Sequence, residues 1–193
     1  MAAAGIEVQV GHGATGTPAY ASAEAPGALV FNRQDAESAG APVIIPSPGN
    51  GLRSSYSNYK ALRLAVVVAG TTNIANFRVR KATAESAGLR LFVPTAVVAT
   101  YAQCTGTAVA QGNRPADTAT ALAAAPHPNT PATYEELPVS PAAKVFDAGS
   151  YATATPGLRG NVLQLLLGVS DQYAGGPSSA ASLPTVTVVY DEA

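Results

Sequence analysis

Residues 60–81 have the sequence KALRLAVVVAGTTNIANFRVRK, and this stretch decides the fold class. Apolar side chains fall at every second position on both sides of a turn sequence at 70–73, and this is the period of a β-strand. The alternating positions are Leu62, Leu64, Val66 and Val68 before the turn, and Phe77 and Val79 after it. The stretch therefore predicts a β-hairpin with one buried face.

The same alternation predicts strands elsewhere in the chain. The expected segments are 6–10, 28–32, 88–93, 97–102, 143–147, 161–169 and 184–190. Several strands separated by turn sequences, with little sign of helix, indicate an all-β protein built as a β-sandwich or jelly roll. Its expected interior contains Leu62, Leu64, Val66, Phe77, Val79, Leu89, Leu91, Leu163, Leu165, Leu167, Val186 and Val188.

Two regions lack this pattern. Residues 1–59 are punctuated by glycine and proline, and they predict an extended N-terminal arm with short strands in front of a sandwich domain at 60–193. Residues 103–142 predict a long Pro/Ala-rich insertion loop, in which Pro115 is compatible with a short helix over 116–125. Both regions hold few large apolar residues, so we expect one or both to be ordered across neighbouring subunits.

The charge content argues against several classes of function. Only 12% of the residues are charged and the net charge is −1, so no basic excess favours nucleic acid as a partner. No apolar run approaches the roughly 20 residues that a membrane span requires. The first residues lack the basic and apolar parts of a signal peptide. A surface with so few charges is poorly protected against association, which suits a protein that neighbours normally cover.

The stretch Gly11-His12-Gly13-Ala14-Thr15-Gly16 matches the glycine spacing of dinucleotide-binding folds and follows a predicted strand. That site requires a helix starting at the glycines, because the helix N-terminus holds the pyrophosphate. Residues 17–27 contain Pro18, Pro26 and Gly27 and no Leu, Ile or Val. We therefore expect a plain glycine-rich loop and no cofactor.

The side chains that usually carry catalysis are scarce. Cys104 is the only cysteine, so no internal disulfide can form, and His12 and His127 are the only histidines. A nucleophilic pair of Cys104 and His127 would need contact and a third orienting group, and the sequence indicates neither. No cluster has the ligand spacing of a metal site. The acidic pairs Glu135-Glu136 and Asp191-Glu192 are interpreted as solvated charges, so we expect no enzymatic activity.

The basic residues are unevenly distributed. Six of the eleven lie within residues 60–90, a stretch with a single acidic residue, Glu85. By strand alternation, four of them oppose the predicted apolar face: Arg63, Arg78, Arg80 and Arg90. They form either an ordinary solvated face or a docking face for an acidic partner surface.

The chain resembles virion proteins of tailed bacteriophages, in particular capsid decoration (cement) proteins. The resemblance is carried by the Ala/Gly/Thr/Pro-rich composition, the arm-like first 59 residues, the strands Leu62–Val68 and Val162–Val169, and the closing Pro184–Glu192. It implies a non-enzymatic subunit with a jelly-roll or immunoglobulin-like fold. Such a homo-oligomer would bind the major capsid protein or other virion subunits in particles assembled in the host cytoplasm.

A receptor- or carbohydrate-binding β-sandwich module of a tail fibre or similar appendage is the alternative. Such a module stacks sugars on aromatic side chains. The candidates for that role are Tyr56, Tyr59, Tyr101 and Tyr134.

Overall fold

The computed structural model describes residues 3–14, 16–23, 31, 54–102, 110–111, 134–170, 173 and 183–192. Every regular element in these residues is a β-strand, so the predicted all-β class is confirmed. The strands are β1 (Gly5–His12), β2 (Ala19–Ser22), β3 (Ser54–Tyr56), β4 (Lys60–Val68), β5 (Asn73–Lys81), β6 (Leu89–Pro94), β7 (Ala110–Gln111), β8 (Tyr134–Glu136), β9 (Lys144–Ala152), β10 (Gly157–Ser170) and β11 (Val186–Glu192).

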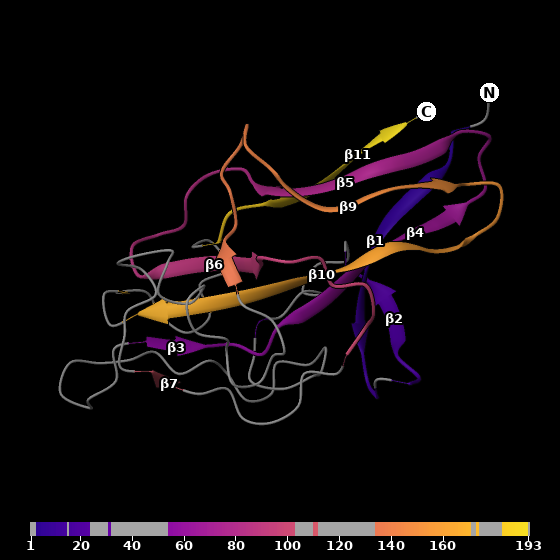
Figure 1. Cartoon of the computed structure of the whole chain (residues 1–193). Helices are drawn as coiled ribbons and strands as arrows, with labels where there is room; N and C mark the ends of the chain where they lie inside the picture. Colours follow the sequence, from indigo (N-terminus) through magenta and orange to yellow (C-terminus); the bar gives the residue numbers. More distant parts are fainter. Residues whose placement is uncertain are drawn as a thin grey trace.

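The strands form two antiparallel sheets, as expected for a β-sandwich (Figure 1). One sheet has eight strands, and neighbouring strands pair in the order β2-β1-β4-β10-β3-β7. In addition, β6 pairs with β10, and β8 pairs with β6. The other has three strands in the order β11-β5-β9. Both strands predicted at 60–81 are present as β4 and β5, but the predicted hairpin is wrong, because the two strands belong to different sheets and do not pair. The turn between them connects the two sheets.

The central strand of the large sheet is β10. Leu163 lies opposite Leu62 of β4, Gly168 lies opposite Tyr56 of β3, and Leu167 lies opposite Leu91 of β6. All three neighbours are antiparallel to β10. This strand therefore fixes the register of most of the large sheet.

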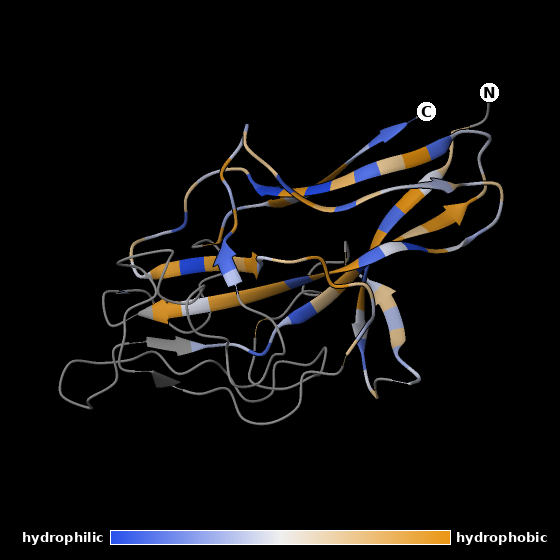
Figure 2. Cartoon of the chain, viewed as in Figure 1, coloured by the Kyte–Doolittle hydropathy of each residue, from blue (hydrophilic) through white to orange (hydrophobic). Residues whose placement is uncertain are grey.

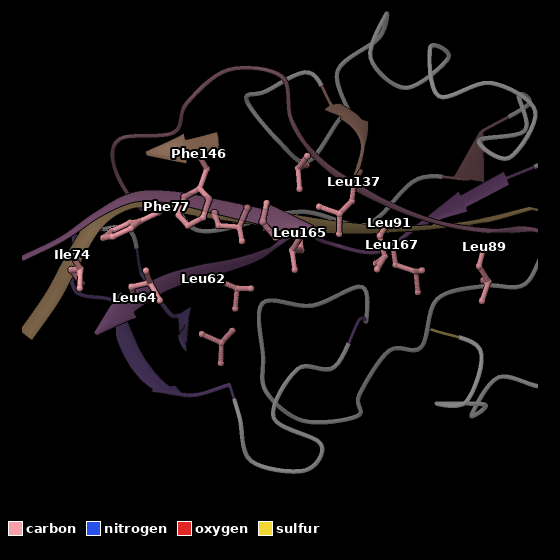
Figure 3. Packing of buried hydrophobic residues seen from close by; sticks show 14 of the residues in the cluster. Leu62, Leu64, Ile74, Phe77, Leu89, Leu91, Leu137, Phe146, Leu165 and Leu167 are labelled. Carbon is pink, nitrogen blue, oxygen red and sulfur yellow. The ribbon is translucent and has the colours of Figure 1, made fainter. Parts of the chain in front are cut away.

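The main core lies between the two sheets (Figure 3). The alternation of apolar and polar side chains along β5 is visible in the hydropathy colouring (Figure 2). Ten of the twelve predicted core residues are buried in one cluster, and Val186 and Val188 pack against it half-buried. The predicted interior is therefore confirmed. The cluster also contains Ile74, Leu137 and Phe146, which the sequence pattern did not indicate.

A second buried cluster lies on the other face of the large sheet. In β10 the odd-numbered residues from Leu163 to Val169 belong to the main core, whereas Val162 and Leu166 belong to the second cluster. The members of this second cluster are Tyr56, Tyr59, Ala61, Phe92, Tyr101, Tyr134, Val162 and Leu166. The large sheet is therefore apolar on both faces.

Most predicted strands are present. The exception within the described residues is 97–102, where the structure has only an isolated bridge between Val98 and Val162. That prediction is wrong because Tyr101 and Val98 pack on the second cluster, and a short apolar run does not reveal whether its backbone joins a ladder. The predicted strand at 28–32, apart from Phe31, and the possible helix at 116–125 lie outside the described residues.

Part of the predicted arm belongs to the large sheet. β1 pairs with β4 from Gly5 opposite Val68 to Gly11 opposite Ala61, and β2 pairs with β1. The side chain of Val10 is buried in the main core. Residues 5–12 are therefore ordered by their own chain and not by a neighbouring subunit, and a deletion of 1–27 would uncover β4.

Candidate docking surface

The four arginines of the predicted docking face lie on both sheets. Arg63 is in β4 and Arg90 is in β6, both in the large sheet, whereas Arg78 and Arg80 are in β5. Strand alternation placed all four opposite the apolar face but could not show that their strands belong to different sheets. The structure therefore divides the predicted stripe into two pairs.

Both arginines of the large sheet are held by local contacts. The guanidinium of Arg63 donates to the carbonyl oxygen of Gly160 over 2.5 Å. Arg90 donates to the carbonyl oxygen of Leu89 over 2.7 Å, and its Nε lies 3.6 Å from a carboxylate oxygen of Glu136. These contacts use part of the hydrogen-bonding capacity that an external partner would need.

The other two arginines lie on the outer face of the small sheet. Arg78 forms an ion pair with Asp191 of β11, and Asn76 donates to the same carboxylate over 2.9 Å. Arg80, opposite Thr187, makes no ion pair or hydrogen bond within the described residues. We call the surface made by Arg78, Arg80, Val145, Thr187 and Val189 the outer arginine face.

Apolar side chains flank the charges on the outer arginine face. Val145 of β9 and Val189 of β11 lie opposite Arg78 on its two sides, and Val145 is 46% exposed. A cation between exposed Val145 and half-buried Val189 offers both charge and apolar area to a partner. Of the two halves of the predicted face, this one has the chemistry of an interface.

The two edges of the small sheet differ. β9 pairs with β5 on one side, and side chains of β10 bind it on the other. Arg159 Nε donates to the carbonyl oxygen of Ala152 over 2.9 Å, and Asn161 Nδ2 donates to the carbonyl oxygen of Phe146 over 3.3 Å. Within the described residues β11 pairs with β5 alone. Among the described residues, therefore, nothing pairs with the outer edge of β11, whereas β9 is held on both sides.

Asp147 is a buried hub between β9 and β10 that the sequence did not reveal. Its carboxylate accepts hydrogen bonds from the backbone N–H groups of Gly149 and Asn161, both over 2.6 Å. The hydroxyl of Tyr151 also donates to it, over 2.9 Å to the nearer oxygen. Burial, the hydrogen bond to Asp147 and the charge of Asp147 raise the pKa of Tyr151, while the charge of Arg63 opposes the shift. These contacts join the two sheets.

Gly160 lies beside this hub with a φ of 70°. A Cβ there would lie 2.5 Å from the ring of Phe77 and 2.7 Å from a carboxylate oxygen of Asp147. Glycine is required both by the backbone conformation and by this close approach. The close approach allows β10 to pass under the small sheet.

A second charged group is buried at the other end of the sandwich. Lys81 Nζ, at the end of β5, lies 2.5 Å from Glu85 and 2.8 Å from Glu136 of β8. The other oxygen of Glu85 accepts from the N–H of Leu91 in β6 over 2.6 Å. Each charge in this group has an opposite charge beside it. The group therefore connects the two sheets and leaves no unpaired nucleophile or base.

The acidic pair Glu135-Glu136 was interpreted as solvated, and both side chains are partly exposed, by 42% and 30%, but both also form ion pairs. Glu136 contacts Lys81 and Arg90, and Glu135 forms an ion pair with Lys144. Both acids come from β8, whose alternation sends the two side chains to opposite faces of the strand. Their cationic partners are distant in sequence, so the pattern alone could not show the pairing.

The glycine-rich stretch at 11–16 connects two antiparallel strands. His12 at the end of β1 lies opposite Ala19 of β2, and the N–H of Thr17 donates to the carbonyl oxygen of Ala14 over 3.0 Å. Gly13 has a φ of 93°, which glycine tolerates best. No helix begins in the described part of this stretch, so the backbone geometry of a pyrophosphate site is absent from it.

Cys104 and His127 lie outside the described residues, so the expectation that they form no nucleophilic pair is not tested. Among the residues that the structure describes, no group of three or more His, Cys, Asp or Glu side chains could hold a metal ion. The same residues include no helix long and apolar enough to cross a membrane.

The four tyrosines that could serve as a sugar platform are buried. None is more than 8% exposed, and all belong to the second cluster. The hydroxyl of Tyr134 donates to Gln164 over 2.7 Å, and that of Tyr101 donates to the carbonyl oxygen of Gly13 over 2.8 Å. Because their rings are covered, these tyrosines cannot stack on a sugar.

An apolar cavity of about 340 Å³ lies between β11 and the large sheet. The described residues that line it are Val8, Ala23, Leu62, Leu165, Val186, Thr187 and Val188. Thr187 is the only polar side chain among them, and none is charged. The described lining therefore provides no set of convergent polar groups that could orient a small-molecule ligand.

Comparison with models of protein families, with curated proteins and with solved structures finds no match to this chain.

Proposed function

We propose that this chain is a non-enzymatic structural subunit of a bacteriophage particle, a capsid decoration (cement) protein that stabilises the head by bridging neighbouring subunits. The observation that carries the proposal is the outer arginine face, where Arg80 has no ionic partner within the described residues and exposed Val145 lies opposite the neighbouring Arg78. Its partner would present acidic groups among apolar ones.

The composition supports this assignment. With 12% charged residues and a net charge of −1, the chain has little electrostatic protection against association. The charges that the structure describes are also largely used internally, as in the ion pairs of Lys81 with Glu85 and of Arg78 with Asp191. A surface of this kind is compatible with a crowded, symmetric particle in which neighbours cover it.

Within this proposal the two sheets form a sandwich of the jelly-roll or immunoglobulin-like type. The partners are the major capsid protein or other virion subunits, and the protein is a homo-oligomer located in the virion. Repetition around the particle would give high avidity even if each interface were modest. The competing sugar-binding function loses its main support because Tyr56, Tyr59, Tyr101 and Tyr134 are buried.

The test is cosedimentation of the purified protein with phage particles assembled in cells that carry its gene. We expect saturable binding that weakens at least tenfold in Arg80→Gln. The control is Ala99→Glu, which lowers the net charge by the same one unit at an exposed position outside the small sheet. Absence of binding by the wild type, or equal binding by Arg80→Gln and the wild type, would contradict the proposal.

A further inference from the structure

β11 has the features of an edge strand that accepts another strand. It is seven residues long, and it pairs with β5 alone within the described residues. Natural edge strands are usually shortened, bulged, covered, or protected by Pro or by charged side chains, Lys above all. Residues 186–192 contain neither Lys nor Pro, and their only charged residues, Asp191 and Glu192, lie at the end of the strand. The pairing of β5 with β11 contains one register shift, and its extra residue lies on β5, where Asn76 has a φ of 53°. β11 itself therefore stays extended.

The other edge strands are less suited to pairing with an additional strand. β9 is tied to β10 through Arg159 and Asn161, as described above. In the large sheet, β2 has four residues, β8 has three and β7 has two. β11 is therefore the longest open edge in the described structure.

We propose that β11 pairs antiparallel with β11 of a second copy of this chain, about a twofold axis that places Val189 opposite Val189 of the second copy. The two small sheets then become one six-stranded sheet in the order β9-β5-β11-β11-β5-β9. In this register residues whose numbers sum to 378 face each other. Odd-numbered residues thus meet odd-numbered ones, and each side chain stays on its own face of the sheet.

Charge complementarity favours a second copy as the partner. In the proposed register, Thr187 lies opposite Asp191 of the second copy. Arg80 is the next residue along the same row, because it lies opposite Thr187 in β5. Arg80 and that aspartate, which already pairs with Arg78 of its own chain, are then two strands apart, about 10 Å between backbones, and both lie on the outer face. The aspartate would bridge the two arginines. An extended arginine covers most of this span, and the twofold axis generates the contact twice.

The side chains on the inner face match as well. Val188 lies opposite Tyr190 of the second copy, and pairs of an aromatic with a β-branched residue stabilise antiparallel strands. Val188 and Tyr190 are only half-buried in the single chain, so both can lose further exposed area. The register thus places Val188 and Tyr190 opposite each other at the centre of the inner face, with Val186 opposite Glu192 at its ends, and an acid near a base on the outer face.

Disulfide formation tests the register directly. In a Cys104→Ala background, Val189→Cys would place two thiols directly opposite each other, at a separation that suits a disulfide. The matched control is Val145→Cys, which lies in the same row of the sheet on the opposite edge and is 46% exposed. We expect mild oxidation to link most of the Val189→Cys protein into dimers and to leave Val145→Cys mainly monomeric. Equal linking of the two variants, or linking of neither, would overturn the register.

Sedimentation equilibrium tests the dimer itself. We expect the wild type to be a dimer at micromolar concentration, and Val189→Lys to raise the dissociation constant at least tenfold, because two lysines would face each other. Circular dichroism should show the same strand content in both proteins. A monomeric wild type would overturn the inference. Pairing does not require the particle, so dimerisation is measured without it. Because Arg80 contributes to both proposed contacts, Val189→Lys and not Arg80→Gln is the variant that tests the dimer separately from particle binding.

Discussion

Lys81 and Glu85 form an ion pair in which neither side chain is exposed to solvent. Glu85 also accepts the N–H of Leu91, and Lys81 contacts Glu136, so the pair holds β5 against β6 and β8. A buried pair of this kind is costly to break, because removing one partner leaves the other charge in the interior.

We therefore expect Lys81→Met to lower the free energy of unfolding by about 3–5 kcal/mol. The control is Lys144→Met, which breaks the ion pair with Glu135 where both side chains are partly exposed, and should cost no more than about 1 kcal/mol. Urea denaturation followed by circular dichroism measures both. Equal costs would show that the burial of Lys81 has no energetic consequence.

Leu165→Ala should lower the free energy of unfolding by about 2–5 kcal/mol, because this side chain is fully buried in the main core at the centre of β10. Val68→Ala, at a position that is 60% exposed, should change it by less than about 0.5 kcal/mol. Denaturant unfolding compares the two. A cost below about 0.5 kcal/mol at Leu165 would contradict the assigned core.

Gly160→Ala should destabilise the protein by about 1–3 kcal/mol, since the new Cβ would meet the ring of Phe77 at a left-handed backbone position. Gly16→Ala is the matched control, because nothing lies within 4 Å of the corresponding Cβ position. The midpoints of thermal unfolding should separate the two variants clearly. A small effect at Gly160 would mean that β10 can move away from Phe77.

Tyr151 should contribute to loss of stability at alkaline pH. Its pKa is raised in the folded state, so the folded protein retains the phenolic proton longer than the unfolded chain does. The stabilisation is complete below the ordinary tyrosine pKa of about 10 and is lost as pH rises through the higher folded value. Tyr151→Phe should therefore flatten the decline of the unfolding free energy above about pH 10. An unchanged decline, measured by denaturation at several pH values, would argue against this.

The triple variant His12→Ala, Cys104→Ala and His127→Ala should fold normally and sediment with particles as the wild type does. None of these side chains has an assigned chemical role in the proposed function. A hydrolytic or redox activity present in the wild type and lost in the triple variant would contradict the non-enzymatic assignment.

The core could be predicted from the sequence because alternation reports directly on burial in a strand. Leu62, Phe77 and Leu165 illustrate this, since all three are buried where the pattern placed them. Alternation does not show which strands are neighbours, so it could not separate Arg63 from Arg78 into two sheets. That separation decides which part of the predicted docking face is available to a partner.

Interactions between residues distant in sequence were also beyond prediction. The hydrogen bond from Asn161 to Asp147 crosses from β10 to β9, and the ion pair between Lys81 and Glu136 spans 55 positions. From the sequence pattern alone, a charged residue is predicted to be solvated unless an opposite charge lies within a few positions of it in the chain. The four buried tyrosines were missed for the same reason, because no strand pattern shows that the second face of the large sheet is covered.

The central position of β10 also affects how the chain acquires its structure. β4 can pair early with β1, but Leu62 of β4 also lies opposite Leu163, so the second partner of β4 exists only after about a hundred further residues are synthesised. Until β10 is synthesised, β4 and β6 both lack the strand that lies between them in the large sheet. Topologies dominated by such distant pairings fold slowly, and their unpaired strands are prone to aggregate. Yield on expression should therefore depend strongly on temperature and on chaperones, even for variants whose final stability is unchanged.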